Sequence, residues 1–147
     1  MAENTATWRN LIAQLTQSYE FFPPADPVAI TDAEQTLQVA LPNDLKQLLT
    51  ETNGVRDRYG SSVIWAVSDI VKHNLEFRAS PAFAELYMPF DALLFFGDSG
   101  DGDQFACVIN AGVIRRDDIF QWHHETDSRS YYARALKQYL QKVLEEV

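Results

Sequence analysis

The chain has 147 residues, 46% hydrophobic and 22% charged, which suffices for one domain with its own core and no metal or disulfide staple. Twelve Lys and Arg against 21 Asp and Glu give a net charge of −9, which repels a phosphate backbone and disfavours nucleic acid as a partner. No apolar run approaches the roughly 20 residues of a membrane span, and no basic-then-apolar leader is seen, so we expect a cytoplasmic protein with no membrane partner.

An amphipathic helix is predicted near the N-terminus. It should end before Pro23-Pro24, because paired prolines cannot continue a helix. Its apolar positions recur at helical spacing: Trp8, Leu11, Ile12, Leu15 and Tyr19.

Two shorter helices are predicted next. Thr31 and Glu34 have the spacing of a capping box, which would begin a helix that turns Ala33 and Leu37 inward. Pro42 suits the first turn of the following helix, and Asn53-Gly54 suits its end, since both residues tolerate left-handed backbone. The inward positions of this helix are Leu45, Leu48 and Leu49.

After Gly60 the pattern changes to strands. Residues 93–96 are too apolar for an edge strand and predict a central one. Ser68 or Asp69 would cap a short helix, and residues 79–91 read as a loop with one helical turn. The other predictions are strands at 62–67, 105–109, 113–115 (after a turn at 110–112) and 119–122, then a helix from about Ser128 with Leu136, Tyr139, Leu140, Val143, Leu144 and Val147 on one face.

This order predicts a single α+β domain over residues 1–147. We expect a mixed or antiparallel sheet of about four to six strands, helices mainly on one face, and long helices at both ends. Alternating βαβ units are missing from the pattern, which argues against a doubly wound nucleotide-binding sheet.

The loop at residues 97–103 is rich in glycine and aspartate. It has no lysine and precedes a strand, so it does not resemble a phosphate-binding loop. Asp98, Asp101 and Asp103 offer oxygens for Ca²⁺, but the glutamate that an EF-hand needs is replaced by Ile109 or Gly112, depending on where counting starts. A tight turn between strands, with aspartates bonded to local amides, is the favoured interpretation.

His123-His124-Glu125 is the second candidate for chemistry. Neighbouring residues on a strand point to opposite faces, so the two histidines would not share a metal, and zinc patterns are missing from the sequence. We expect one histidine in the core and the other in solvent, with Glu125 capping the last helix or pairing with an arginine. No Gly-x-Ser-x-Gly elbow is present, although a triad assembled in space stays open. The single cysteine, Cys107, lies in an apolar run and should be buried and inert.

The motifs together resemble the SUKH superfamily, the Smi/Knr-like domains, over residues 30–147. One difference is Gln38 after Leu37, where many members carry glycine. The residues that carry the resemblance are Ile30-Thr31 with Glu34, Leu41-Pro42, Asp44-Leu45-Lys46, Leu48-Leu49, Asn53-Gly54, Phe96-Gly97 through Gly102-Asp103, and Trp122, His124 and Glu125.

This resemblance implies a non-catalytic protein. Bacterial members look like immunity proteins that bind and block a toxin domain, often a nuclease, and a related fungal domain belongs to a regulator of cell-wall assembly. The resemblance implies that the recurring signature residues shape the fold, and it implies no cofactor. The residues concerned are Leu41, Pro42, Leu45, Leu49, Asn53, Gly54, Phe96, Gly97, Gly102, Asp103, Trp122, His124 and Glu125.

Three hypotheses follow from the sequence. The first is an immunity protein, monomeric by default, whose acidic surface binds a basic toxin; its candidate contacts are Asp57, Tyr59, Asp98, Asp101, Asp103, Asp117 and Asp118. The second is a regulatory or scaffolding domain with an ordinary cellular partner. The third, least favoured, is a metal-dependent enzyme or binder using Asp101, Asp103, His124 and Glu125.

Overall fold

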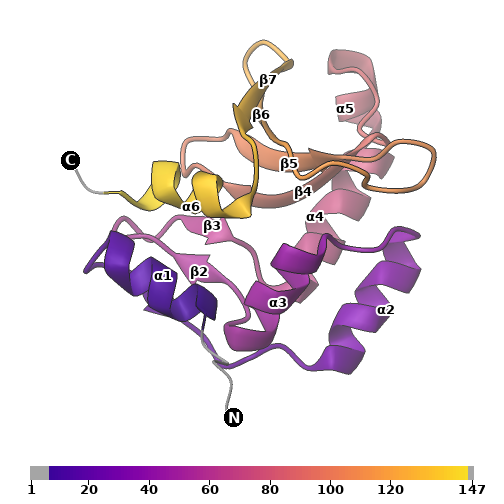
Figure 1. Cartoon of the computed structure of the whole chain (residues 1–147). Helices are drawn as coiled ribbons and strands as arrows, with labels where there is room; N and C mark the ends of the chain where they lie inside the picture. Colours follow the sequence, from indigo (N-terminus) through magenta and orange to yellow (C-terminus); the bar gives the residue numbers. More distant parts are fainter. Residues whose placement is uncertain (1–6, 146–147) are drawn as a thin grey trace.

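The computed structural model describes residues 7–145 and has the predicted α+β class (Figure 1). Within these residues there are six helices and two antiparallel sheets, one of three strands and one of four. Figure 1 shows α1, α2 and α3 on one side of the molecule and the four-stranded sheet on the other. The elements are α1 (Thr7–Leu15), β1 (Glu20–Phe21), α2 (Pro27–Leu37), α3 (Asn43–Glu51), β2 (Val55–Arg56), β3 (Ser62–Ile64), α4 (Val67–Ala79), α5 (Pro81–Leu86), β4 (Leu93–Asp98), β5 (Gln104–Val108), β6 (Ile119–His123), β7 (Ser128–Ala133) and α6 (Leu136–Leu144).

The N-terminal helix α1 is held by a buried carboxylate. Glu51, the last residue of α3, accepts hydrogen bonds from the main-chain N–H groups of Trp8 (2.8 Å) and Arg9 (3.0 Å). These bonds satisfy amides that a helix start leaves without a partner. The helix ends before Tyr19, which the periodicity had included, because the chain there turns into β1 and pairs with β2.

The prediction that Thr31 and Glu34 begin helix α2 as a capping box is wrong, because the helix begins earlier. Asp26 caps the helix and Pro27 takes its first turn. Thr31 therefore lies inside the helix, where its hydroxyl donates to the Pro27 carbonyl (3.2 Å). Glu34 instead pairs with Lys46 of α3 (3.3 Å). The predicted inward positions on both helices are buried: Ala33, Leu37, Leu45, Leu48 and Leu49.

Asn53 and Gly54 carry the chain from α3 into the first sheet. The Asn53 side chain accepts the Val67 N–H (2.9 Å) and so caps α4, while Ser68 and Asp69, the predicted caps, lie inside that helix. Gly54 has a φ of +110°, and a Cβ there would lie 3.1 Å from the Ile64 carbonyl oxygen. Glycine is needed at this position for both reasons.

Strand β4 is the first strand of the order β4-β5-β6-β7, so the predicted central position is wrong. Its outer edge is nevertheless covered. The Asn74 side chain of α4 donates to the Phe95 carbonyl (2.8 Å) and accepts the Phe95 N–H (2.9 Å), and the Trp65 N–H donates to the Phe96 carbonyl (2.8 Å). Asn74 of α4 and Trp65, the residue after β3, thus satisfy main-chain groups of this edge, which explains how an apolar strand can lie there.

Two predictions near the C-terminus are wrong. Residues 128–133 form strand β7 against β6, and the last helix starts at Leu136 instead of near Ser128. Residues 113–115 form no regular strand, since only Asn110 and Val113 pair across the predicted turn. The predicted apolar face of the helix is confirmed within the described residues, and Val147 lies outside them; the buried positions are Leu136, Tyr139, Leu140 and Leu144.

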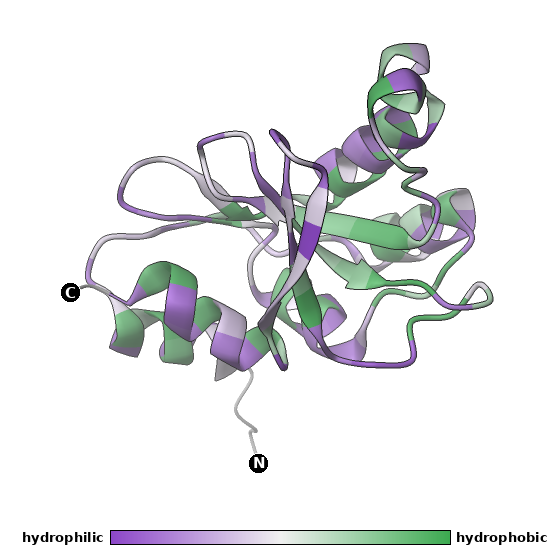
Figure 2. Ribbon diagram, turned by 90° about the horizontal axis from the view of Figure 1, so that it is seen from above, coloured by the Kyte–Doolittle hydropathy of each residue, from purple (hydrophilic) through white to green (hydrophobic). Residues whose placement is uncertain are grey.

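Helices cover both faces of the four-stranded sheet, where we had expected them mainly on one. On one face Tyr139 of α6 packs against Phe96 and Phe105, with ring centroids 5.1 and 4.9 Å away. On the other face Phe77 of α4 packs against Trp122, at 5.8 Å. Figure 2 shows the resulting core as green strands through the middle of the molecule.

The two sheets meet where β3 passes β4. A Cβ at Gly97 would overlap the Val63 carbonyl, and the Tyr139 hydroxyl donates to that carbonyl oxygen (2.6 Å). Glycine therefore allows the two strands to approach, and the tyrosine fixes α6 across their junction. The loop before β3 and the loop after β4 are thereby brought to the same end of the molecule.

Candidate functional site

The predicted contact residues fall into two groups. Asp57 and Tyr59 lie in the loop between β2 and β3, and Asp98, Asp101 and Asp103 lie at the end of β4 and in the loop after it. These two loops touch, because a Cβ at Gly100 would overlap the Ser61 hydroxyl. With the β6–β7 turn (residues 124–127) they make one end of the molecule, which we call the acidic end.

Asp117 and Asp118 do not belong to the acidic end. They lie in the loop between β5 and β6, at the opposite end of an antiparallel strand pair. Asp118 pairs with Arg116 (2.9 Å), and Asp117 lines a small hollow of about 20 Å³ beside Asp44 and Cys107. Cys107 is buried as predicted, and burial raises the pKa of its thiol to about 12.

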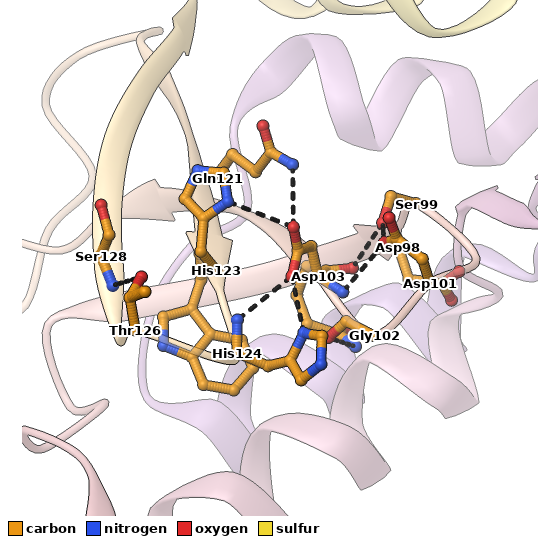
Figure 3. Close-up of polar contacts among 12 residues, drawn as sticks. Asp98, Ser99, Asp101, Gly102, Asp103, Gln121, His123, His124, Thr126 and Ser128 are labelled. Atoms are coloured by element: carbon orange, nitrogen blue, oxygen red, sulfur yellow. Dashed lines mark hydrogen bonds and ion pairs between the residues drawn. The ribbon is translucent and has the colours of Figure 1, made fainter.

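Asp103 is the centre of the polar network at the acidic end (Figure 3). One carboxylate oxygen accepts the His124 main-chain N–H (3.1 Å) and lies 2.7 Å from His124 Nδ1. The other lies 3.2 Å from His123 Nδ1 and accepts the Gln121 amide (3.3 Å). One side chain thus ties the loop after β4 to both β6 and the turn that follows it.

The expected separation of the two histidines is wrong. His123 is the last residue of β6 and His124 begins the turn, so the alternation of a strand no longer applies. Both rings reach the same carboxylate, and both remain more than a third exposed, at 36% and 39%. Glu125 is exposed beside them.

The charges of this network reinforce one another. Burial opposes ionisation of Asp103, but the hydrogen bonds from His124 and the charges of both histidines hold the pKa of Asp103 below its ordinary value. The hydrogen bond to Asp103 raises the pKa of His124 above 6.5, and the charges of Asp103, Glu125 and Asp101 add to this effect, while burial opposes it. The carboxylate and the imidazolium therefore stabilise each other's charged form.

The remaining aspartates of the acidic end hold its loops. Asp57 accepts the N–H groups of Tyr59 and Ser61, both at 2.9 Å. Asp98 accepts the Gly100 N–H (3.0 Å) and the indole N–H of Trp65 (2.8 Å). In addition, the Ser99 hydroxyl donates to Asp101. These bonds agree with the predicted role of aspartates in shaping a turn.

A cleft of about 220 Å³ opens between the two loops and α6. No pattern in the sequence predicted this cleft, because its lining residues come from seven separate segments of the chain. We call it the Asp57–Asp98 cleft; its lining residues are Asp57, Val63, Asp98, Ser99, Phe105, Gln121, Tyr132 and Val143.

A hydroxyl, an imidazole and a carboxylate are also linked in a row at the acidic end. The Ser130 hydroxyl of β7 is 3.0 Å from His123 Nε2, whose other ring nitrogen faces Asp103. This is the connectivity of a nucleophilic triad, which the sequence had left open. A catalytic site additionally needs donors aimed at an oxyanion. The Asp103 carboxylate is also bonded to His124 and Gln121. This sharing is expected of a structural network that holds chain segments together.

Neither a metal cluster nor a membrane helix is found in the part of the chain that the structure describes. Within residues 7–145, no group of three or more His, Cys, Asp or Glu side chains is arranged to hold a metal ion. None of the helices in that range is both long and apolar enough to cross a bilayer.

Signature residues lie both at junctions between segments and in the core. Gly102 leaves room for the His124 ring, since a Cβ there would lie 2.7 Å from it. Trp122 donates its indole N–H to Asp127 in the β6–β7 turn (2.8 Å). Leu41, Leu45, Leu49 and Phe96 are buried in the core.

A family model described as SMI1-KNR4 cell-wall (SUKH_6) matches residues 28–140. The chain belongs to this SUKH family. The match includes all the signature residues as well as the acidic end. A comparison with curated proteins gave no match.

Proposed function

We propose that this SUKH protein is a non-catalytic, cytoplasmic immunity protein that neutralises a basic toxin domain by stoichiometric binding. The observation that carries the proposal is the acidic end, where the loop of Asp57 touches the loop of Asp98 and Asp101. Tyr59, in the first of these loops, is 77% exposed. A toxin that holds phosphates presents cationic groups, and complementary charge speeds association with such a partner. Tyrosine is enriched at interfaces because its ring buries area at low entropic cost.

Size is compatible with this function. A standard protein interface buries roughly 800 Å² per partner, which is about a tenth of the 8079 Å² surface of this chain. The acidic end can therefore supply an inhibitory interface without rearrangement of the core. Its loops are held by their own hydrogen bonds, so binding would order little additional chain.

The test is co-expression with the candidate toxin domain encoded beside the gene, followed by scoring of growth and co-purification. We expect rescue of growth and a stable one-to-one complex whose association rate falls steeply as salt is raised. Rescue with a salt-insensitive association rate would refute the electrostatic part of the proposal. Absence of rescue and of complex with each neighbouring candidate would refute the immunity function.

A second candidate is a regulatory or scaffolding domain with an ordinary protein partner. It is favoured by the description of the matched family, which names SMI1-KNR4 and the cell wall. Such a domain would give no protection from a toxin. A phenotype of deletion in the absence of any toxin, in growth or in cell-wall integrity, would support this candidate over the first.

A further inference from the structure

The Asp57–Asp98 cleft has apolar walls and two carboxylates. Val63, Phe105 and Val143 supply the apolar surface, and Asp57 and Asp98 stand in the same lining. The methylene stem of a lysine or arginine buries well against such walls while its charged head meets an anion. A purely apolar ligand would take water away from both carboxylates without supplying a counter-charge, which is unfavourable.

The donors given for the two carboxylates within residues 7–145 are neutral. Asp57 accepts main-chain amides, and Asp98 accepts one amide and the Trp65 indole. Of the described residues that line the cleft, none is Lys or Arg. The negative charge inside the cleft is therefore available to an incoming cation.

Two cations, Arg58 and Lys142, lie against aromatic rings and are not part of that lining. Arg58 stacks on Tyr59, 5.0 Å from the ring centroid, and Lys142 lies 4.0 Å from the centroid of Tyr132 and donates to the Tyr132 carbonyl (2.8 Å). The field of the two carboxylates also reaches the buried Tyr139 beside the cleft. The pKa of Tyr139 is raised first by burial and also by the charges of Tyr132, Asp98 and Asp57.

We infer that the Asp57–Asp98 cleft binds a cationic side chain, lysine or arginine, presented by a protein partner. This inference rests on the proposed function, since the basic toxin would supply that side chain as an anchor. Charge complementarity identifies the occupant: within about 220 Å³ the cleft combines apolar side chains with two carboxylates, and none of its described lining residues is Lys or Arg.

The first experiment uses small probes on the whole protein. N-acetyl-arginine methylamide and its lysine counterpart are titrated while amide and indole resonances are followed by NMR. N-acetyl-citrulline methylamide, which keeps the shape of arginine without its charge, is the matched control. We expect saturable shifts at Ser61, Ser99 and the Trp65 indole with the cationic probes and at least tenfold weaker binding of citrulline. Equal binding of citrulline, or shifts centred elsewhere, would overturn the inference.

Two variants with the same change of net charge locate the effect. Asp57→Asn keeps an acceptor oxygen for the loop amides and removes the charge from the cleft. Asp117→Asn removes one charge at the opposite end of β5. We expect Asp57→Asn to abolish probe binding and Asp117→Asn to preserve it. If Asp57→Asn fails to fold, Asp98→Asn takes its place as the test variant. The comparison of arginine with citrulline on the native protein tests the inference without any variant.

The same variants then distinguish this inference from the proposed function. With a neutralised toxin in hand, Asp57→Asn should raise Kd about 30-fold, equivalent to about 2 kcal/mol, mainly through faster dissociation. Asp117→Asn should change Kd less than about threefold. Toxin binding unaffected by Asp57→Asn would overturn the cleft while leaving immunity intact. Probe binding that requires Asp57, without any toxin partner, would support the cleft and refute the immunity function.

Discussion

Replacing Asp103 by alanine removes the carboxylate that joins the loop after β4 to β6 and to the β6–β7 turn. Four donors or ring nitrogens lose their partner, one of them the main-chain N–H of His124. The Asp103 side chain is only 15% exposed, so water replaces these bonds incompletely. The two ring contacts are screened by solvent and contribute little, while a hydrogen bond to a charged group is worth about 1.5–3 kcal/mol. We therefore expect Asp103→Ala to lower the free energy of unfolding by about 2–3 kcal/mol.

Two further variants bracket this value. Asp103→Asn keeps one acceptor oxygen, and the Gln121 amide and the His123 tautomer can reverse to meet its NH₂ group, so about 1 kcal/mol should be lost. Asp101→Ala is the control in the same loop. Asp101 accepts only the Ser99 hydroxyl and a long bond from the Asp103 N–H (3.4 Å), so about 0.5 kcal/mol or less should be lost.

The stability lost in Asp103→Ala should depend on pH in a characteristic way. The pKa of Asp103 is lowered in the folded protein, so its contribution is present above about 3.8 and is lost as pH falls below that value. The pKa of His124 is raised, so its contribution is present below 6.5 and is lost as pH rises through the folded pKa. The difference between native protein and Asp103→Ala should be largest between these limits.

The assay is urea denaturation followed by tryptophan fluorescence at several values between pH 3 and pH 9. A loss for Asp103→Ala no greater than that for Asp101→Ala would refute the argument from the shared carboxylate. A difference that stays constant over the whole pH range would refute the coupling between Asp103 and His124.

Three other expectations follow from the structure. Asn74→Ala should lower the free energy of unfolding, measured by urea denaturation, by about 2–5 kcal/mol, because it leaves the buried N–H and C=O of Phe95 unpaired. The control Lys72→Ala, on the exposed side of α4, should lower it by less than about 0.5 kcal/mol. Equal losses would contradict the edge-covering role of Asn74. Cys107, with its pKa raised to about 12, should react with a disulfide reagent at pH 8 only after unfolding, and rapid stoichiometric labelling of the native protein would show that the thiol is accessible. A fluorophosphonate probe should label Ser130 no more than the background seen with Ser130→Ala, since the proposed function is non-catalytic; labelling above that background would count against it.

The helices were predicted best where apolar spacing alone determines them. Leu45, Leu48 and Leu49 repeat at the helical period and are buried. The start of α2 was missed because Asp26-Pro27 begins the helix before the more familiar spacing of Thr31 and Glu34. Two local helix-start signals thus compete here, and the one that comes first along the chain, Asp26-Pro27, begins the helix.

The strands show what a sequence pattern leaves open. The edge position of β4 was hidden, because a side chain 21 residues away, Asn74, satisfies it in place of a neighbouring strand. Strand β7 was predicted as the start of a helix, because residues 128–133 show no apolar alternation. The two-residue strands β1 and β2 are set by pairing alone and are too short to have a pattern.

The candidate site was predicted in its parts and missed in its assembly. The aspartates of the loop after β4 were singled out, and their hydrogen bonds to local amides agree with a structural turn. The contact of Asp103 with both histidines was missed, because it depends on β6 ending at His123. Asp117 and Asp118 were grouped with the others by charge, and antiparallel topology separates them.

The contact between Gly100 and Ser61 makes the two acidic loops a matched pair. Adding a residue to either loop would displace the other, and shortening either would open a gap beneath the cleft. Anyone transplanting recognition from one SUKH protein to another must therefore exchange residues 57–61 and 98–103 together. A graft of a single loop carries the charges of the donor without the geometry that orients them.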